Sequence, residues 1–172
     1  MDEAGRQARH APAPLRQGRG PSGPEDGACE PGEGAVIAAD REWHGREGAS
    51  SAELDKFRSF VPTTLPQGYY DLLGFSNGGE GPFGVQPCWF VLDTAEEAAT
   101  AWTDKVHAEF FPALFVFGSN GAGEAFAFDL NADGVRIVYF DTMNSNLAES
   151  VVELATLMDT FIDLIGIDEV AA

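Results

Sequence analysis

This 172-residue sequence contains little cysteine and histidine and no long apolar run, and each absence excludes a class of protein. The two cysteines, Cys29 and Cys88, lie far apart and provide neither a disulfide framework nor a zinc-ligand spacing. His107 has no cysteine or second histidine near it in the sequence, so we expect no metal site and no cofactor. Since no segment resembles a signal peptide or a bilayer-spanning helix, we expect a cytoplasmic protein that does not bind membranes.

Basic residues are also scarce. The chain has ten Lys plus Arg against 28 Asp plus Glu, which gives a formal net charge of −18. Such a field repels nucleic acids and anionic membranes and attracts basic proteins, although it also serves solubility alone. Residues 35–172 hold 22 of the acids and six of the bases, and therefore a net charge of −16. The acidity thus belongs to the part of the chain expected to fold.

Composition divides the chain into three regions. Residues 1–34 contain 12 Gly or Pro and few large apolar residues, which predicts disorder. Alternatively, translation starts nearer Val36. The arginines of this region could form a nucleic-acid-binding arm, but six acids outnumber its four arginines. Residues 35–49 are expected to be a linker or an edge strand at Val36–Ile37, and residues 50–168 a single domain with its own core.

Four helices are predicted in this domain. Ser51 is the expected N-cap of the first, which Pro62 ends. Residues at helical spacing form its expected buried face: Leu54, Phe57, Phe60 and Val61. Pro66 suits the first position of a second helix, which stops at residues 77–79. Thr94 and Glu97 form a capping box for a third helix, and Thr156 with Asp159 is expected to cap the closing helix.

Strands alternate with these helices. The apolar runs 113–117 and 135–140, with residues 125–128 between them, are separated by turns rich in Gly, Asn and Asp. This pattern predicts consecutive antiparallel strands at the centre of a sheet. Residues 88–92 form another expected strand, with Cys88 in the core, and residues 150–155 are a candidate last strand. The element order predicts an α+β domain with helices packed on one face of a mostly antiparallel sheet.

No motif indicates catalysis or ligand binding. Residues 79–84 spell G-x-G-x-x-G, but they follow a predicted helix and contain Pro82, so we expect a loop. Residues 129–134 match the start of an EF-hand loop, but its twelfth position is Phe140 rather than Glu. Ser119 and His107 lie in no recognisable triad context, and we therefore expect no enzyme.

Three segments together resemble the SUKH superfamily. Leu65-Pro66-x-x-Tyr69-Tyr70-x-x-Leu73 followed by Asn77-Gly78-Gly79-Glu80-Gly81 is similar to its opening signature. Residues 117–129, a strand, a glycine-rich turn and a strand ending in Asp129, resemble its second signature, and residues 156–165 its closing helix. One departure is Ala122, where the family pattern usually has a third glycine. The resemblance covers about residues 50–165.

The resemblance implies a SUKH-like domain that binds proteins without catalysis. In bacteria it implies an immunity protein that neutralises a polymorphic toxin, and the negative charge favours a basic toxin domain as partner. The alternative is a scaffold or regulatory protein that binds an endogenous partner. From their acidic, exposed contexts we expect three partner-binding residues: Glu80, Asp104 and Glu109. Structural roles are expected for the signature residues Asn77, Gly78, Gly79, Gly121, Gly123, Glu124 and Asp129.

Overall fold

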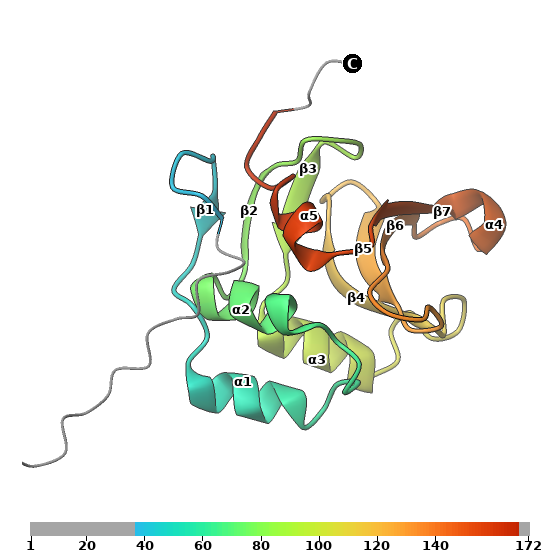
Figure 1. Ribbon diagram of the computed structural model, residues 1–172. Coiled ribbons are helices and arrows are strands. Elements are labelled where there is room, and N and C mark those ends of the chain that lie inside the picture. Colours follow the sequence, from blue (N-terminus) through green and yellow to red (C-terminus); the bar gives the residue numbers. More distant parts are fainter. Residues whose placement is uncertain (1–36, 169–172) are drawn as a thin grey trace, which may run out of the picture. The chain divides into compact units, whose positions relative to one another are not determined.

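The computed structural model describes residues 37–168, which form an α+β domain around one antiparallel sheet. Within these residues seven strands lie in the order β1-β2-β3-β4-β5-β6-β7, so each strand pairs with its neighbour in sequence (Figure 1). This arrangement confirms the predicted fold class. The predicted disorder of residues 1–34 concerns residues outside the described part.

The first two helices carry different caps from those expected. Helix α1 (Ser51–Arg58) is capped by Ser50 rather than Ser51, and Glu53 completes the capping box. The predicted cap was wrong by one residue: Glu53 lies three residues after Ser50, whereas Leu54 is at that spacing from Ser51 and cannot complete a capping box. Helix α2 (Gln67–Phe75) starts after Pro66, whose extended backbone makes it the N-cap and not the first helical residue.

The expected loop at residues 79–84 is partly a strand, β2 (Gly79–Pro82), which lies between β1 (His44–Gly45) and β3 (Trp89–Leu92). Among the described residues β1 is the edge strand next to β2. Ile37 is not in a strand and is buried in the core, and Val36, also expected in an edge strand, lies outside the described residues. The loop prediction for residues 79–84 failed because Gly and Pro are depleted in strands, whereas here pairing with β1 and β3 overrides that preference. Cys88, expected in the core, precedes β3 at a φ of 67° and is half-buried.

The capping box of Thr94 and Glu97 is confirmed at the start of helix α3 (Ala95–Thr103). A connector, residues 104–113, then leads to strands β4 (Leu114–Ser119), β5 (Glu124–Asp129) and β6 (Ile137–Asp141). These strands form the consecutive antiparallel pairs that their sequences predict. Trp102 packs against Phe115 of β4, with ring centroids 5.5 Å apart.

The chain ends in helix α4 (Leu147–Ser150), strand β7 (Val151–Ala155) and helix α5 (Met158–Ile162). β7 confirms the candidate last strand. The predicted cap of the closing helix was wrong: Leu157 is the N-cap of α5, and no side chain caps it. The helix is fixed by burial of Met158, Phe161 and Ile162 in the core, which local capping rules do not detect.

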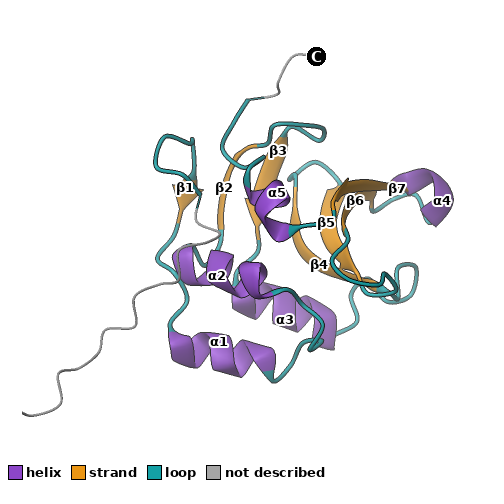
Figure 2. Cartoon of the chain, viewed as in Figure 1, coloured by secondary structure: helices purple, strands orange, loops and turns teal. Residues whose placement is uncertain are grey.

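Two apolar clusters lie on opposite faces of the central strands. Phe115 and Phe117 of β4 belong to the larger cluster, to which α1, α2, α3 and α5 all contribute. Figure 2 shows these helices in purple beside the orange strands. Leu114 and Val116 belong to a smaller cluster on the other face, which also contains Phe111 of the connector. The alternation follows from the two-residue period of a strand. The helices thus pack on one face, and the connector covers part of the other.

Candidate functional site

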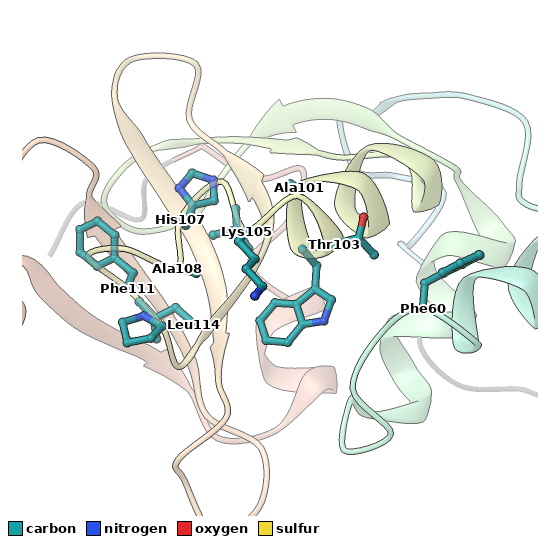
Figure 3. Close-up of a pocket in the computed structure, with 11 residues that line it drawn as sticks. Phe60, Ala101, Thr103, Lys105, His107, Ala108, Phe111 and Leu114 are labelled. Atoms are coloured by element: carbon teal, nitrogen blue, oxygen red, sulfur yellow. The ribbon is translucent and has the colours of Figure 1, made fainter.

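Two adjacent hollows meet at Phe60, just beyond the end of α1. The first, which we call the α1–α3 groove, has a volume of about 470 Å³ and is lined by Glu53, Lys56, Phe57, Phe60, Asn77, Thr94, Ala95, Glu96, Ala99, Thr100 and Thr103. The second, the connector pocket, has a volume of about 450 Å³ and is lined by Phe60, Ala101, Trp102, Thr103, Lys105, His107, Ala108, Phe111, Pro112, Leu114 and Val116. Figure 3 shows Phe60 at one end of the connector pocket and Phe111 with Leu114 at the other.

Helical periodicity builds the walls of the α1–α3 groove. One wall contains residues 53, 56, 57 and 60, and the other contains residues 96, 99, 100 and 103. Residues 53, 56 and 57 lie on one face of α1, and Phe60 joins this wall from the turn that follows the helix. Residues 96, 99, 100 and 103 follow the i, i+3, i+4, i+7 spacing that places side chains on one face of α3. Ala99, Thr100 and Thr103 are small, so the α3 wall is low and the groove stays open.

Phe60 was expected in the buried face of α1, but 51% of its surface is exposed. The helix ends at Arg58, and Ser59 is its C-cap, so Phe60 is no longer in phase with Leu54 and Phe57. The helical spacing therefore gave a wrong prediction at this residue. An exposed aromatic side chain between two hollows is a typical feature of a protein-binding surface.

The connector holds its shape through local backbone hydrogen bonds. The Val106 N–H donates to the Ala101 carbonyl and the Phe111 N–H to the His107 carbonyl. Lys105 takes a φ of 56°, which is uncommon for a residue with a side chain. Val106 and Phe110 are 62% and 57% exposed, so the connector adds apolar surface next to the pocket.

His107 lies against Phe140 in the connector pocket, with ring centroids 6.5 Å apart. Burial lowers the pKa of His107 below its usual value of 6.5, which leaves the imidazole neutral at pH 7. Lys105 is therefore the one charged group in the lining of this pocket at neutral pH.

Three of the six Lys and Arg side chains in the described region make contacts within the fold. Arg41 donates to the Asp163 carbonyl, and Arg136 lies between Asp129 and Glu153 at 2.6 and 2.9 Å. Arg58 stacks over the Tyr70 ring, 3.8 Å from its centroid. Two bases, Lys56 and Lys105, line the hollows, and four exposed acids line them or lie in the adjoining sequence: Glu53, Glu96, Asp104 and Glu109. The surface here is apolar at its centre and mainly acidic at its edges.

The structure separates the three residues expected to bind a partner. Asp104 and Glu109 are both exposed on the connector, where Asp104 is also the C-cap of α3. Glu80 lies on β2 and accepts a hydrogen bond of 3.2 Å from Trp89 Nε1. Two of the three therefore adjoin the connector pocket, and the third belongs to a different part of the sheet.

The first signature residues lie where backbone segments meet. Asn77 Oδ1 accepts a 2.8 Å hydrogen bond from the Ala95 N–H at the start of α3, and Asn77 also lines the α1–α3 groove. Gly78 and Gly79 have φ values of 94° and 141°. A Cβ atom on Gly79 would lie 2.7 Å from the Trp43 ring.

The remaining signature residues, Gly121, Gly123, Glu124 and Asp129, shape the β4–β5 and β5–β6 turns. Gly121 and Gly123 have φ values of 72° and 112°, whereas Ala122 has no positive φ, so alanine is accommodated there without strain. Glu124 accepts a 2.6 Å hydrogen bond from the Asn120 amide, and Asp129 accepts one from the Asn131 N–H at 3.0 Å. These contacts all lie within the domain.

Within residues 37–168 no group of three His, Cys, Asp or Glu side chains could hold a metal ion. The same residues contain no helix with the length and hydropathy to cross a bilayer.

The buried hydroxyl of Tyr69 has no hydrogen-bond partner within the described residues, and burial raises the pKa of Tyr69 well above 10. Burial also raises the pKa of Asp93 to about 6, with a smaller contribution from Glu97.

Sequence reasoning missed the three features that define the two hollows. They are the exposure of Phe60, the closeness of α1 to α3, and the connector pocket under Lys105. Only the first has a local signal: Ser59 bonds back to Lys56 through both its N–H and its hydroxyl and so ends the helix.

Comparison with known proteins identifies one family. The sequence model of the SMI1 / KNR4 family (SUKH-1) matches residues 48–165, which is well over half of the chain. No curated protein gives a significant match.

Proposed function

Since the chain belongs to the SMI1 / KNR4 family (SUKH-1), we propose that it is a protein-binding domain without catalytic activity that neutralises a bacterial toxin by binding to it. The proposal assigns the toxin a basic surface and places both proteins in the cytoplasm. The matched region includes both hollows and the connector between them.

The observation that carries the proposal is the exposed Phe60 between two open hollows. Binding energy at protein interfaces concentrates in a few aromatic or otherwise large side chains that are surrounded by polar residues. Phe60 has this setting, with Trp102 half-buried in the adjoining pocket and acids at the margin.

The charge of the molecule supports a basic partner. The chain carries −18, and the described arginines are largely engaged with the fold itself. A protein with such a field is steered toward basic surfaces, which raises the association rate more than the final affinity. Asp104 and Glu109 on the connector are proposed to meet basic groups of the toxin.

A growth assay tests this function. The full chain is co-expressed in bacteria with each toxin domain encoded near its gene, and survival is compared with that of cells lacking the chain. Protection from one toxin, together with a purified complex of the two proteins, is the expected result. Loss of protection in Phe60→Ser but not in Met143→Ser, an apolar control that is 89% exposed against 51% for Phe60, would assign binding to the Phe60 surface.

The proposal is wrong if the chain protects against none of these toxins. Affinity capture from lysate of its own host, at low and high salt, then tests the alternative of a scaffold that binds an endogenous protein. A non-toxic partner retained at high salt would favour that alternative.

A further inference from the structure

The α1–α3 groove has the form of a site for a third helix. The α3 wall presents four residues at i, i+3, i+4, i+7 spacing, and the opposite wall presents three residues of α1 together with Phe60 just beyond its end. Helices pack by placing side-chain ridges into such grooves. Ala99, Thr100 and Thr103 of the α3 wall are small, which permits the close approach of another backbone beyond Glu96. Residues 96–103 of α3 span seven helical steps, or about 10 Å, so about two turns of an added helix fill the groove.

The two ends of the groove differ in chemistry. Glu53 and Glu96 lie near the N-terminal ends of α1 and α3, while Phe60 and Thr103 lie near their C-terminal ends. Glu53 accepts hydrogen bonds from the Ser50 N–H and hydroxyl, which lowers the pKa of Glu53 and keeps it charged. Glu96 is exposed. One end is therefore acidic, and the other is apolar.

We infer that the α1–α3 groove binds a short amphipathic helix of the partner, with Lys or Arg at its acidic end and an apolar side chain beside Phe60. The inference rests on the proposed function and assigns the binding surface within it. The occupant is cationic because the groove contains one base, Lys56, against two acids, in a chain of net charge −18. Helix binding in a groove of this kind is a recurring recognition mode that uses apolar anchors one helix turn apart.

The test uses a defined probe and does not require the toxin. A stapled 14-residue helix with Leu and Ala on one face and Lys elsewhere is titrated into the isotope-labelled full chain. A second peptide has every Lys replaced by Glu. Amide resonances of Glu96, Ala99, Thr100, Thr103 and Phe60 are expected to shift with the Lys peptide and not with the Glu peptide.

Three variants test whether the Lys peptide binds in the α1–α3 groove. Phe60→Ser and Thr100→Trp, which respectively remove the anchor and fill the groove at an exposed position, are each expected to weaken binding about tenfold or more. Glu96→Gln is expected to weaken it about threefold. The matched controls are Met143→Ser and Glu149→Gln, the latter an acid in the first turn of α4, and both are expected to leave binding unchanged.

Shifts outside the groove, equal binding of the Glu peptide, or equal loss in the controls would overturn the inference. So would groove resonances that move with protein concentration alone, since a second copy of the chain would then be the occupant. These outcomes are independent of the growth assay. If the toxin binds at another surface, the proposed function stands and the inference about the groove is wrong. If the peptide binds in the groove but the chain protects against no toxin, the inference about the groove stands and the proposed function is wrong.

Discussion

Trp43 shows how single residues organise this fold. Its ring stacks on Phe90, with centroids 6.0 Å apart, and its Nε1 donates to Ser76 Oγ at 3.1 Å. The Ser76 hydroxyl donates in turn to the Gly78 carbonyl at 2.6 Å. Gly79 borders the ring so closely that a Cβ atom there would overlap it. Glycine at position 79, the first residue of β2, is therefore required by a tryptophan located more than thirty residues earlier.

Gly79→Ala is expected to lower the free energy of unfolding by roughly 2–4 kcal/mol, because it combines an unfavourable φ with a clash against the Trp43 ring. Gly121→Ala is the control, since Gly121 also has a positive φ but nothing lies within 4 Å of the added methyl group. Its expected cost is about 1 kcal/mol. Urea unfolding of both variants measures the difference, and equal costs would show that the contact with Trp43 is unimportant.

Asp93 is an acidic residue that destabilises the native state at neutral pH. Burial raises the pKa of Asp93 from 3.8 to about 6, so the folded protein holds this proton more tightly than the unfolded chain. Its stabilising contribution is complete below pH 3.8 and is lost as the pH rises through 6. The cost at pH 7.5 is about 3 kcal/mol, as an order of magnitude.

Asp93→Asn removes this charge and is therefore expected to raise the free energy of unfolding by up to about 3 kcal/mol at pH 7.5. The gain is expected to fall below about 1 kcal/mol at pH 4, where Asp93 is protonated when folded. Urea unfolding of both proteins across this pH range measures the difference. A gain that does not depend on pH would indicate that the carboxylate is not desolvated.

At the scale of elements, capping decides where the helices of the candidate site begin. Both helices that wall the α1–α3 groove start with a capping box, Ser50 with Glu53 and Thr94 with Glu97. In each, the acid accepts from the N-cap N–H at 2.8 Å. The two boxes fix which residues of α1 and α3 face each other across the groove.

Ser50→Ala is expected to cost about 1 kcal/mol of stability, because it removes the acceptor for the Glu53 N–H. Ser51→Ala is its neighbour control, and its expected effect is within about 0.5 kcal/mol since Ser51 is exposed and is the first helical residue. Thermal unfolding of the two variants distinguishes them. A larger loss of stability in Ser51→Ala than in Ser50→Ala would show that Ser51, and not Ser50, is the N-cap of α1.

Elements with complete local signals are the ones that the sequence predicted well. The box at Thr94 and the alternation along β4 and β5 depend on residues within a few positions of each other. Where an element depends on distant partners, the prediction failed in whole or in part: the strand β2 was expected to be a loop, and the closing helix α5 was predicted with the wrong N-cap. β2 forms a strand because β1 and β3 lie on either side of it, and α5 forms because Phe161 fills a space beside Phe83 and Phe90.

At the scale of the whole molecule, the net charge of −18 opposes the compact state by self-repulsion. Salt screens such repulsion over about 8 Å at 0.15 M. The melting temperature is therefore expected to rise as NaCl increases from low concentration to 0.5 M, with a similar rise in KCl. Differential scanning calorimetry measures this, and an unchanged or falling melting temperature would show that the acids are compensated within the fold.

The sequence by itself determined the acidity, the helix start at Thr94, the alternation of the central strands and the family signatures, since each depends on composition or on near neighbours. Tertiary structure alone decided that α1 and α3, more than thirty residues apart, wall one groove and that Phe60 stays exposed between two hollows. It also decided that Glu80 lies apart from Asp104 and Glu109. The physical reason is that propensity and capping act over a turn or two of chain, whereas a binding surface is made by contacts between distant segments.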